Sequence, residues 1–282
     1  MAGQIILRAS VEQCDIAALR DAYGKMQNLS ATDNRSWIFW ADKHGFPVFD
    51  CWHHFREGPA GRRFRYDLFL PWHRAYLTYW EHVARDQNPD AIPPWWDWTS
   101  ARSHEIGVPE AYTQPEADGQ PNPLFSGPTP DMPDDPARRT RRFPGDPAEL
   151  PGPSVVDGLL ALGDYLDFSS QLQDVHDQIH GWTGGINPDD PTQGGDMGNI
   201  ATSAFDPIFW AHHCMIDRIW YLWQLRHGLG NIPADYLGLT LVPFGYSVRD
   251  VLDIHSLGYE YAGSAVTAPG PAGTAANSGG QP

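Results

Sequence analysis

The chain has 282 residues, of which 41% are hydrophobic and 19% charged, so it can bury a sizeable core in one or two domains. Its formal net charge of −16 disfavours nucleic acid and anionic membranes as partners, because both repel an acidic protein. No apolar run is long enough to span a membrane and no secretory signal is visible, which favours a cytoplasmic protein. Three cysteines are too few for a disulfide framework, whereas the 12 histidines call for an explanation.

Apolar spacing and capping residues predict four main helices, at residues 15–28, 73–86, 169–182 and 206–227. Between the second and the third, residues 101–153 hold twelve prolines and a run of arginines, which predicts an irregular insertion. Residues 262–282 lack charged and aromatic side chains, which predicts a flexible tail. Strand patterns are few. We therefore expect one mainly α-helical domain over residues 1–261, with long loops and little strand.

Two histidine pairs lie on the predicted helices of the second half. His176 and His180 are four residues apart, so both rings lie on one helix face and can share a metal ion. The alternative for this pair is a solvated helix face. His212 and His213 are adjacent and point about 100° apart, so at most one of them can comfortably join a given metal.

Five more histidines cluster in the first half of the chain, at His44, His53, His54, His73 and His82. His73 and His82 lie on opposite sides of one predicted helix and cannot bind the same ion. His44 and His53 lie in loop-like segments that can fold back toward His73.

The type of ligand narrows the choice of metal. The sequence has no Glu-x-x-His pair at His176 or His180, no His-Glu-x-x-His and no Cys-x-x-Cys, which disfavours carboxylate-bridged di-iron, thermolysin-like zinc and structural zinc sites. Groups of imidazoles without carboxylates suit copper or catalytic zinc. Spacing alone leaves these two metals open.

Longer motifs add a family resemblance. In chain order they are HGFP (44–47), CWH (51–53), FLPWHRAYLTYWE (69–81), PPWWDWTS (93–100), HDQIHGWTGG (176–185), DMG (196–198) and FDPIFWAHHCMIDRIWYLWQ (205–224). This order resembles the tyrosinase and polyphenol oxidase family of type-3 dicopper proteins over roughly residues 15–261. The resemblance implies a four-helix bundle that holds two copper ions, each bound by three histidines.

Matched motif by motif, the resemblance implies two ligand sets and their support. The first copper would be bound by His44, His53 and His73, and the second by His176, His180 and His212. Behind these ligands, the resemblance implies supporting roles for His213, for Asp217, which would orient a ligand, and for Arg218, which would tie helices together. The long link between His53 and His73 leaves His54 open as an alternative to His53. No motif role falls to His82, His104, His227 or His255.

The resemblance also implies a covalent bond at the first copper. In family members with the Cys-x-His motif, the cysteine forms a thioether with the histidine two residues later, which would join Cys51 to His53. The alternative for Cys51 is a small buried thiol. Cys14 and Cys214 match no such motif and are expected to be plain core thiols.

Three further positions in the family bear on the chemistry. Asp177, next to a ligand of the second copper, matches a position linked to substrate orientation and phenol deprotonation, although it can also be a solvated helix carboxylate. Gly181 matches a second position of this kind. Many members carry a water-orienting Glu before the first ligand of the second copper. The nearby residues here are Gln173 and Asp174, so that role stays unassigned.

The implied activity is the oxidation of a small phenolic substrate, with O2 as co-substrate. O-Diphenols would give o-quinones, and monophenols would be hydroxylated at the ortho position. An oxidase restricted to diphenols or o-aminophenols stays open. A haemocyanin-like oxygen carrier is a further alternative, disfavoured because one copper domain is followed here by a polar tail. Some bacterial relatives leave the cell with a partner protein, so a partner for copper delivery or export is also conceivable.

Overall fold

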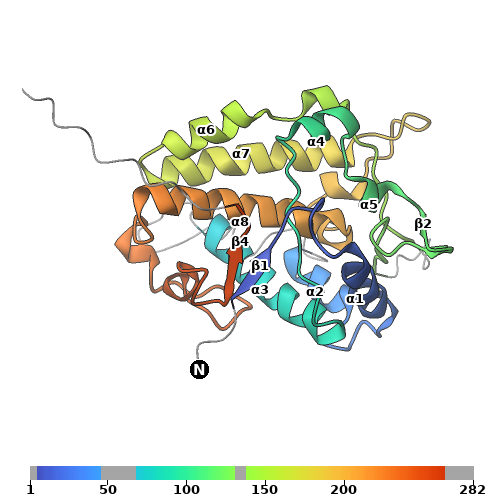
Figure 1. Cartoon of the computed structure of the whole chain (residues 1–282), viewed down its shortest axis with the longest axis horizontal. Helices are drawn as coiled ribbons and strands as arrows, with labels where there is room; N and C mark the ends of the chain where they lie inside the picture. Colours follow the sequence, from blue (N-terminus) through green and yellow to red (C-terminus); the bar gives the residue numbers. More distant parts are fainter. Residues whose placement is uncertain (1–4, 46–67, 131–137, 264–282) are drawn as a thin grey trace, which may run out of the picture.

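The computed structural model of the chain describes residues 5–45, 68–130 and 138–263 (Figure 1). The described part is mainly helical and contains little strand, as predicted. Its long helices are α1 (Ile16–Asn28), α3 (Phe69–Gln87), α7 (Tyr165–Gly184) and α8 (Ile208–His227). Its shorter helices are α2 (Trp37–Ala41), α4 (Ala101–Ile106), α5 (Glu110–Thr113) and α6 (Pro153–Ala161). None of the described helices has the length and hydropathy needed to cross a membrane.

The four predicted helices are confirmed, with shifts at their ends. Helix α3 begins before His73 because Pro71 is tolerated in a first helical turn, where no backbone donor is needed. Helix α7 begins at Tyr165, before the predicted start at residue 169, because the Asp164 side chain accepts hydrogen bonds from the backbone N–H groups of Leu166 and Asp167. At its other end Gly185 adopts φ 57°, and a Cβ there would clash with the Phe143 backbone.

Aromatic side chains pack the long helices together. The Trp80 ring of α3 stacks on Trp210 of α8 and meets Tyr23 of α1 edge to face, and its Nε1 donates to the Tyr23 hydroxyl over 3.0 Å. At the far end of α8, Trp223 stacks on Phe168 of α7, with ring centroids 4.8 Å apart. Helix α3 is therefore held against α1 and α8, and α7 lies on the other side of α8.

The first and last described segments pair with each other. Strand β1 (Ile6–Arg8) runs parallel to β4 (Tyr259–Tyr261), and the two lie side by side in Figure 1. Arg8 is fully buried and donates from Nε to Glu81 of α3 over 2.7 Å. The pair of strands is thereby fixed to the helical core. The only other paired strands among the described residues are β2 (Glu116–Ala117) and β3 (Gln120–Pro121).

The proline-rich insertion packs on the connection between α7 and α8. Arg138 donates to Asp196 over 2.6 Å, and Nε of Arg142 lies 3.3 Å from Oδ2 of Asp206. Burial raises the pKa of Asp206 to about 6, although Arg142 opposes that shift. The described part of the insertion contains short helices and the β2–β3 pair, joined by irregular segments. Its arginines hold the residues that connect α7 to α8.

Candidate metal centre

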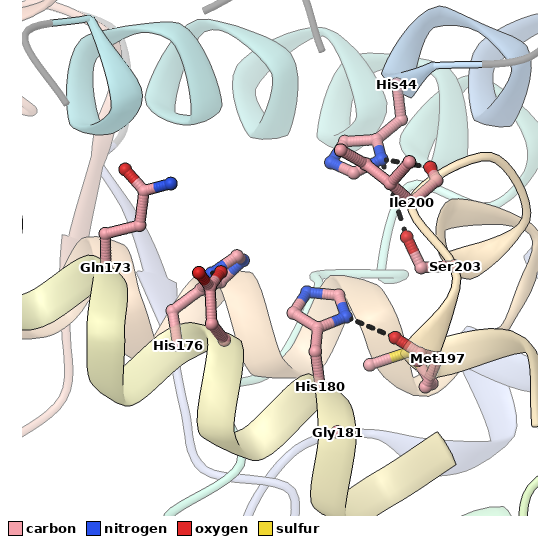
Figure 2. Close-up of a pocket in the computed structure, with 10 residues that line it drawn as sticks. His44, Gln173, His176, His180, Gly181, Met197, Ile200 and Ser203 are labelled. Carbon is pink, nitrogen blue, oxygen red and sulfur yellow. Dashed lines mark hydrogen bonds and ion pairs between the residues drawn. The ribbon is translucent and has the colours of Figure 1, made fainter. Parts of the chain in front are cut away.

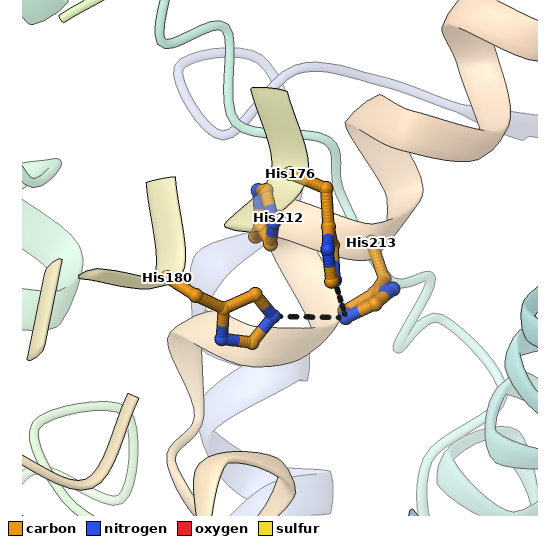
Figure 3. A group of neighbouring side chains, drawn as sticks. All are labelled: His176, His180, His212 and His213. Carbon is orange, nitrogen blue, oxygen red and sulfur yellow. Dashed lines mark hydrogen bonds between the residues drawn. The ribbon is translucent and has the colours of Figure 1, made fainter. Parts of the chain in front are cut away.

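Six histidines from four elements converge in the interior of the bundle. Helix α7 contributes His176 and His180, and α8 contributes His212 and His213 (Figure 3). Helix α3 contributes His73, and a 3₁₀ turn at Asp42–His44 contributes His44. Their ring nitrogens form two groups: His176, His180, His212 and His213 in one, and His44, His73 and His213 in the other.

The first group has the spacing of metal ligands. The Nε2 atom of His213 lies 3.3 Å from Nε2 of His176 and 3.3 Å from Nε2 of His180. Two nitrogens that each bind one ion at roughly 2.0–2.1 Å stand about this far apart in a trigonal or tetrahedral site. These three nitrogens therefore fit a common ion without rearrangement.

The second group adjoins the first through His213. The rings of His73 and His213 stack with centroids 4.2 Å apart, and His44 lies 5.6 Å from His73 between ring centroids. The ligand atoms of His44, His73 and His213 all lie within 4.8 Å of one another. Because His213 takes part in both groups, two ions bound there would be neighbours. The predicted ligand His53, its alternative His54 and the predicted thioether partner Cys51 lie outside the described residues.

Hydrogen bonds orient four of the imidazoles. Nδ1 of His180 donates to the Met197 carbonyl over 2.7 Å, and Nδ1 of His44 donates to the Ile200 carbonyl over 3.1 Å (Figure 2). In α3, Nδ1 of His73 lies 2.9 Å from the Phe69 carbonyl. A carbonyl accepts only from a protonated nitrogen. In a neutral ring, a proton on Nδ1 therefore leaves Nε2 unprotonated, with its lone pair directed toward the other imidazoles of the site.

The fourth imidazole, that of His176, is oriented by a side chain rather than by a backbone carbonyl. Nδ1 of His176 donates to Oδ1 of Asp177 over 2.9 Å, and the Asp177 side chain is about half exposed, at 49%. A carboxylate in this place fixes the ring orientation of a ligand and increases its basicity. Asp177 also lines the pocket beside the imidazoles. This place is compatible with the predicted roles in substrate orientation and phenol deprotonation.

Burial favours the neutral form of four of the imidazoles. It lowers the pKa of His180, and it lowers the pKa of His73, His212 and His213 well below the ordinary value, with further lowering from neighbouring imidazoles in the last three. A neutral imidazole has a lone pair available for a metal, whereas a protonated one does not. The donor set therefore fits a metal that accepts nitrogen ligands.

His212 lies in the first group, but in a different position from His213. Its ring stacks on His176 with centroids 5.2 Å apart, and neither of its nitrogens has a hydrogen-bond partner. The ring nitrogens of His212 form no hydrogen-bond contact with the ring nitrogens of His176 or His180, whereas Nε2 of His213 contacts both. The sequence expectation placed His213 behind the ligands. The structure instead places its Nε2 among them.

Asp217 lies in a cluster of buried polar side chains. Its partners are Arg74, which donates over 2.6 Å, Arg8 at 3.5 Å, and the hydroxyls of Tyr259 and Tyr261 at 2.6 Å each. No histidine of the described ranges is among these partners. Burial opposes ionisation of Asp217, yet the two arginines and the two hydroxyls outweigh it, and its pKa is lowered. This carboxylate instead joins α3, α8, β1 and β4.

Arg218 also contacts a loop rather than a second helix. Its guanidinium lies over the Trp95 ring, with 4.2 Å between the Arg218 Cζ atom and the ring centroid. The histidines without a motif role lie away from both groups, as expected. Ring nitrogens of His104 and His227 face backbone carbonyls, and His255 lies beside Asp253.

A pocket of about 220 Å³ opens beside the imidazoles (Figure 2). One wall is the row Gln173, Asp177 and Gly181 on α7, next to His176 and His180. The opposite side is formed by His44 and by Met197, Gly198, Ile200 and Ser203. Nothing lies within 4 Å of the position of a Cβ on Gly181, so this glycine leaves open space at the end of the row.

Two adjoining groups of buried imidazoles inside a helical bundle are the arrangement expected of a protein that can hold two neighbouring metal ions. Residues 22–226 match the family described as the common central domain of tyrosinase. The chain belongs to this family of type-3 copper proteins, and the family implies two copper ions.

Curated relatives include both tyrosinases and hemocyanins. The tyrosinase of Streptomyces antibioticus is 32% identical over 214 residues, which cover 68% of this chain and 78% of that protein. Hemocyanin units G and H of Sepia officinalis are 27% identical over 275 residues, or 89% of this chain and 44% of that protein. The chain spans half or less of the length of the hemocyanins it matches.

Solved structures show the same fold. The tyrosinase from Burkholderia thailandensis superposes with a TM-score of 0.75 at 21% identity, covering 95% of this chain and 75% of that one. A functional unit from Octopus hemocyanin superposes with a TM-score of 0.70 at 25% identity, covering 92% of this chain and 68% of that one. The helical dicopper domain is therefore common to proteins with both names.

Proposed function

We propose that the chain is a copper-dependent oxidase of small phenols. In the proposed reaction, two o-diphenols and one O2 give two o-quinones and two waters. A monophenol and one O2 give one o-quinone and one water. The observation that supports an enzyme is the pocket of about 220 Å³ beside His44, His176 and His180. A space of roughly 10–15 Å³ already holds one water, so this pocket offers far more room than O2 alone needs.

We assign the metal ligands from the geometry and the family resemblance together. His176, His180 and His213 would hold one copper, because their Nε2 atoms converge. His44 and His73 would hold the other, with His53 as the ligand implied by the Cys-x-His motif. His212 would pack behind His176. When bound, copper supplies one-electron redox chemistry, and imidazole ligands suit both of its oxidation states.

The residues around the pocket would prepare the substrate. Asp177 would accept the proton of a phenol hydroxyl, because its carboxylate lines the pocket and is half exposed. Its hydrogen bond from His176 would couple that proton transfer to a metal ligand. Met197 and Ile200 would contact the ring with their apolar side chains, and the space beyond Gly181 would receive a substituent.

An oxygen carrier is the second candidate, favoured by the hemocyanin relatives and by the TM-score of 0.70 to a hemocyanin unit. Oxygen uptake separates the two. The copper-loaded chain should consume O2 continuously with catechol, and the metal-free chain should consume none. Reversible O2 binding without turnover of catechol, o-aminophenol or tyrosine would identify a carrier. Uptake with catechol or o-aminophenol but not with tyrosine would identify an oxidase that does not hydroxylate monophenols.

A further inference from the structure

Gln173 lies in the pocket wall with an amide oxygen that has no partner among the described residues. The residue is one turn before His176 on α7, is only 2% exposed, and lines the pocket. Its Oε1 is buried without a hydrogen-bond partner, and its amide makes no hydrogen bond to any residue in the described ranges. Figure 2 shows the amide reaching from α7 into the space above His176, with its nitrogen on the side of His44.

An amide in such a place calls for a partner that the described residues do not supply. Burying a polar group without a hydrogen bond opposes folding, whereas an apolar side chain of the same length would fill the space without that penalty. An amide can also donate and accept at the same time, as a hydroxyl can. The partner that suits it best is therefore a hydroxyl or amino group on a bound ligand.

Asp177 lies beside Gln173 in the same wall of the pocket. Gln173 and Asp177 are four residues apart on α7, and such neighbours have Cβ atoms about 5–6 Å apart. The same wall therefore offers a carboxylate and an amide side by side, next to the imidazoles. A ring with two adjacent polar substituents can meet both groups, whereas a monophenol can meet only one.

We propose that Gln173 is a substrate-positioning residue that selects ortho-disubstituted phenols. Its amide hydrogen-bonds to the second ring substituent, a hydroxyl or an amino group, while the first hydroxyl faces Asp177 and the metal ligands. The preferred substrate class is thus o-diphenols and o-aminophenols, ahead of monophenols. This inference rests on the proposed oxidation of phenols and specifies its substrate.

A binding experiment without oxidation tests the role of the amide. Zinc also binds imidazole ligands but has no redox chemistry, so zinc-loaded protein can be titrated calorimetrically with catechol and with phenol. In Gln173→Met, which keeps the length of the side chain, catechol should bind about tenfold more weakly because one hydrogen bond is lost. Phenol should bind as it does to the unsubstituted chain. Equal weakening of both ligands, or of neither, would overturn the inference.

A kinetic comparison separates this inference from the proposed function. With copper-loaded protein, Gln173→Met should raise KM for catechol and o-aminophenol and leave that for phenol or tyrosine unchanged. Gln173→Glu retains an acceptor at the same distance and should restore part of the catechol preference in the zinc-loaded protein. An unsubstituted chain that oxidises no phenol, yet binds catechol through Gln173, would refute the oxidase and keep the binding role. Oxidation of catechol that is indifferent to both substitutions would refute Gln173 alone.

Discussion

Trp80 of α3 and Trp210 of α8 stack face to face, with ring centroids 3.4 Å apart and an angle of 6° between the planes. The same two helices carry His73 and His213, whose rings stack 4.2 Å apart. The tryptophan pair lies two helical turns along α3 from His73 and one turn along α8 from His213. Its packing therefore fixes the alignment of α3 and α8 that brings these two imidazoles together.

Removing one ring of this stack should cost stability. Trp80→Ala leaves a cavity in a fully buried position, and we expect a loss of about 3–5 kcal/mol in the free energy of unfolding. Urea denaturation of the metal-free chain measures it. Trp40→Ala is the matched control, because Trp40 is only partly buried where it stacks on Tyr79. A loss at position 80 no larger than that at position 40 would contradict the proposed importance of the stack.

The proposed ligand set predicts different effects at two adjacent histidines. His213→Phe should remove the copper held with His176 and His180, because the three converging Nε2 atoms become two. His212→Phe keeps a ring against His176 and should retain about two coppers per chain, the content that the family implies. Metal analysis after gel filtration measures both, with the exposed His255→Gln as control. The opposite pattern would make His212 the ligand.

The buried carboxylate of Asp217 predicts a large loss on neutralisation. Asp217→Asn leaves Arg74 without its buried counter-charge, whereas Arg8 keeps Glu81, and should cost about 3–5 kcal/mol of unfolding free energy. Asp21→Asn breaks an exposed pair with Lys25 and should cost less than about 1 kcal/mol. Chemical denaturation of both variants gives the comparison. Equal costs would show that the Asp217 cluster stabilises no more than a surface pair.

The buried imidazoles predict how the stability of the metal-free chain depends on pH. Burial holds the pKa of His73, His212 and His213 below the value of about 6.5 in an unfolded chain. Between the two values the unfolded chain binds more protons, so the unfolding free energy rises with pH and is lost as pH falls below about 6.5. Urea midpoints at acidic and neutral pH measure this slope. His213→Phe should flatten it, His255→Gln should not, and a midpoint insensitive to pH would refute the prediction.

The predicted thioether between Cys51 and His53 can be tested by mass. Forming the sulfur–carbon bond removes one hydrogen from each residue, and its two electrons pass to O2 in the copper-loaded chain. The intact protein should weigh less than its sequence by two hydrogens, and thiol titration after denaturation should find only Cys14 and Cys214. Peptide mapping would also decide between His53 and His54. Three free thiols in active, copper-loaded enzyme would show that the bond is absent.

Much of the bundle is predictable from the sequence because its signals are local. Helical periodicity locates α1, α3, α7 and α8, and the spacing of His176 and His180 places both on one face of α7. Which of His212 and His213 points toward His176 and His180 cannot be read from the local sequence. It depends on how α8 is rotated against α3 and α7, which the packing of rings such as Trp210 decides.

Other parts of the site leave little trace in the sequence. The partners of His44 and His180 are backbone carbonyls, which every residue has, so no motif signals them. The contacts of Asp217 with Tyr259 and Tyr261 could not be predicted either, because these partners follow more than forty residues later. Gln173 could have been noticed as an amide beside a ligand pair, but its lack of a partner emerges only in three dimensions.

The carbonyls of Met197 and Ile200 belong to one short connection between α7 and α8, yet they hold one imidazole from each metal group. A movement of this connection would therefore turn His180 and His44 at the same time. The arginines of the insertion clamp it from outside, through Asp196 and Asp206. The two groups of imidazoles, one for each proposed copper, thus share one support. Substitution of Arg138 or Arg142 would therefore disturb the orientation of His180 and of His44 at once, although neither arginine contacts these imidazoles.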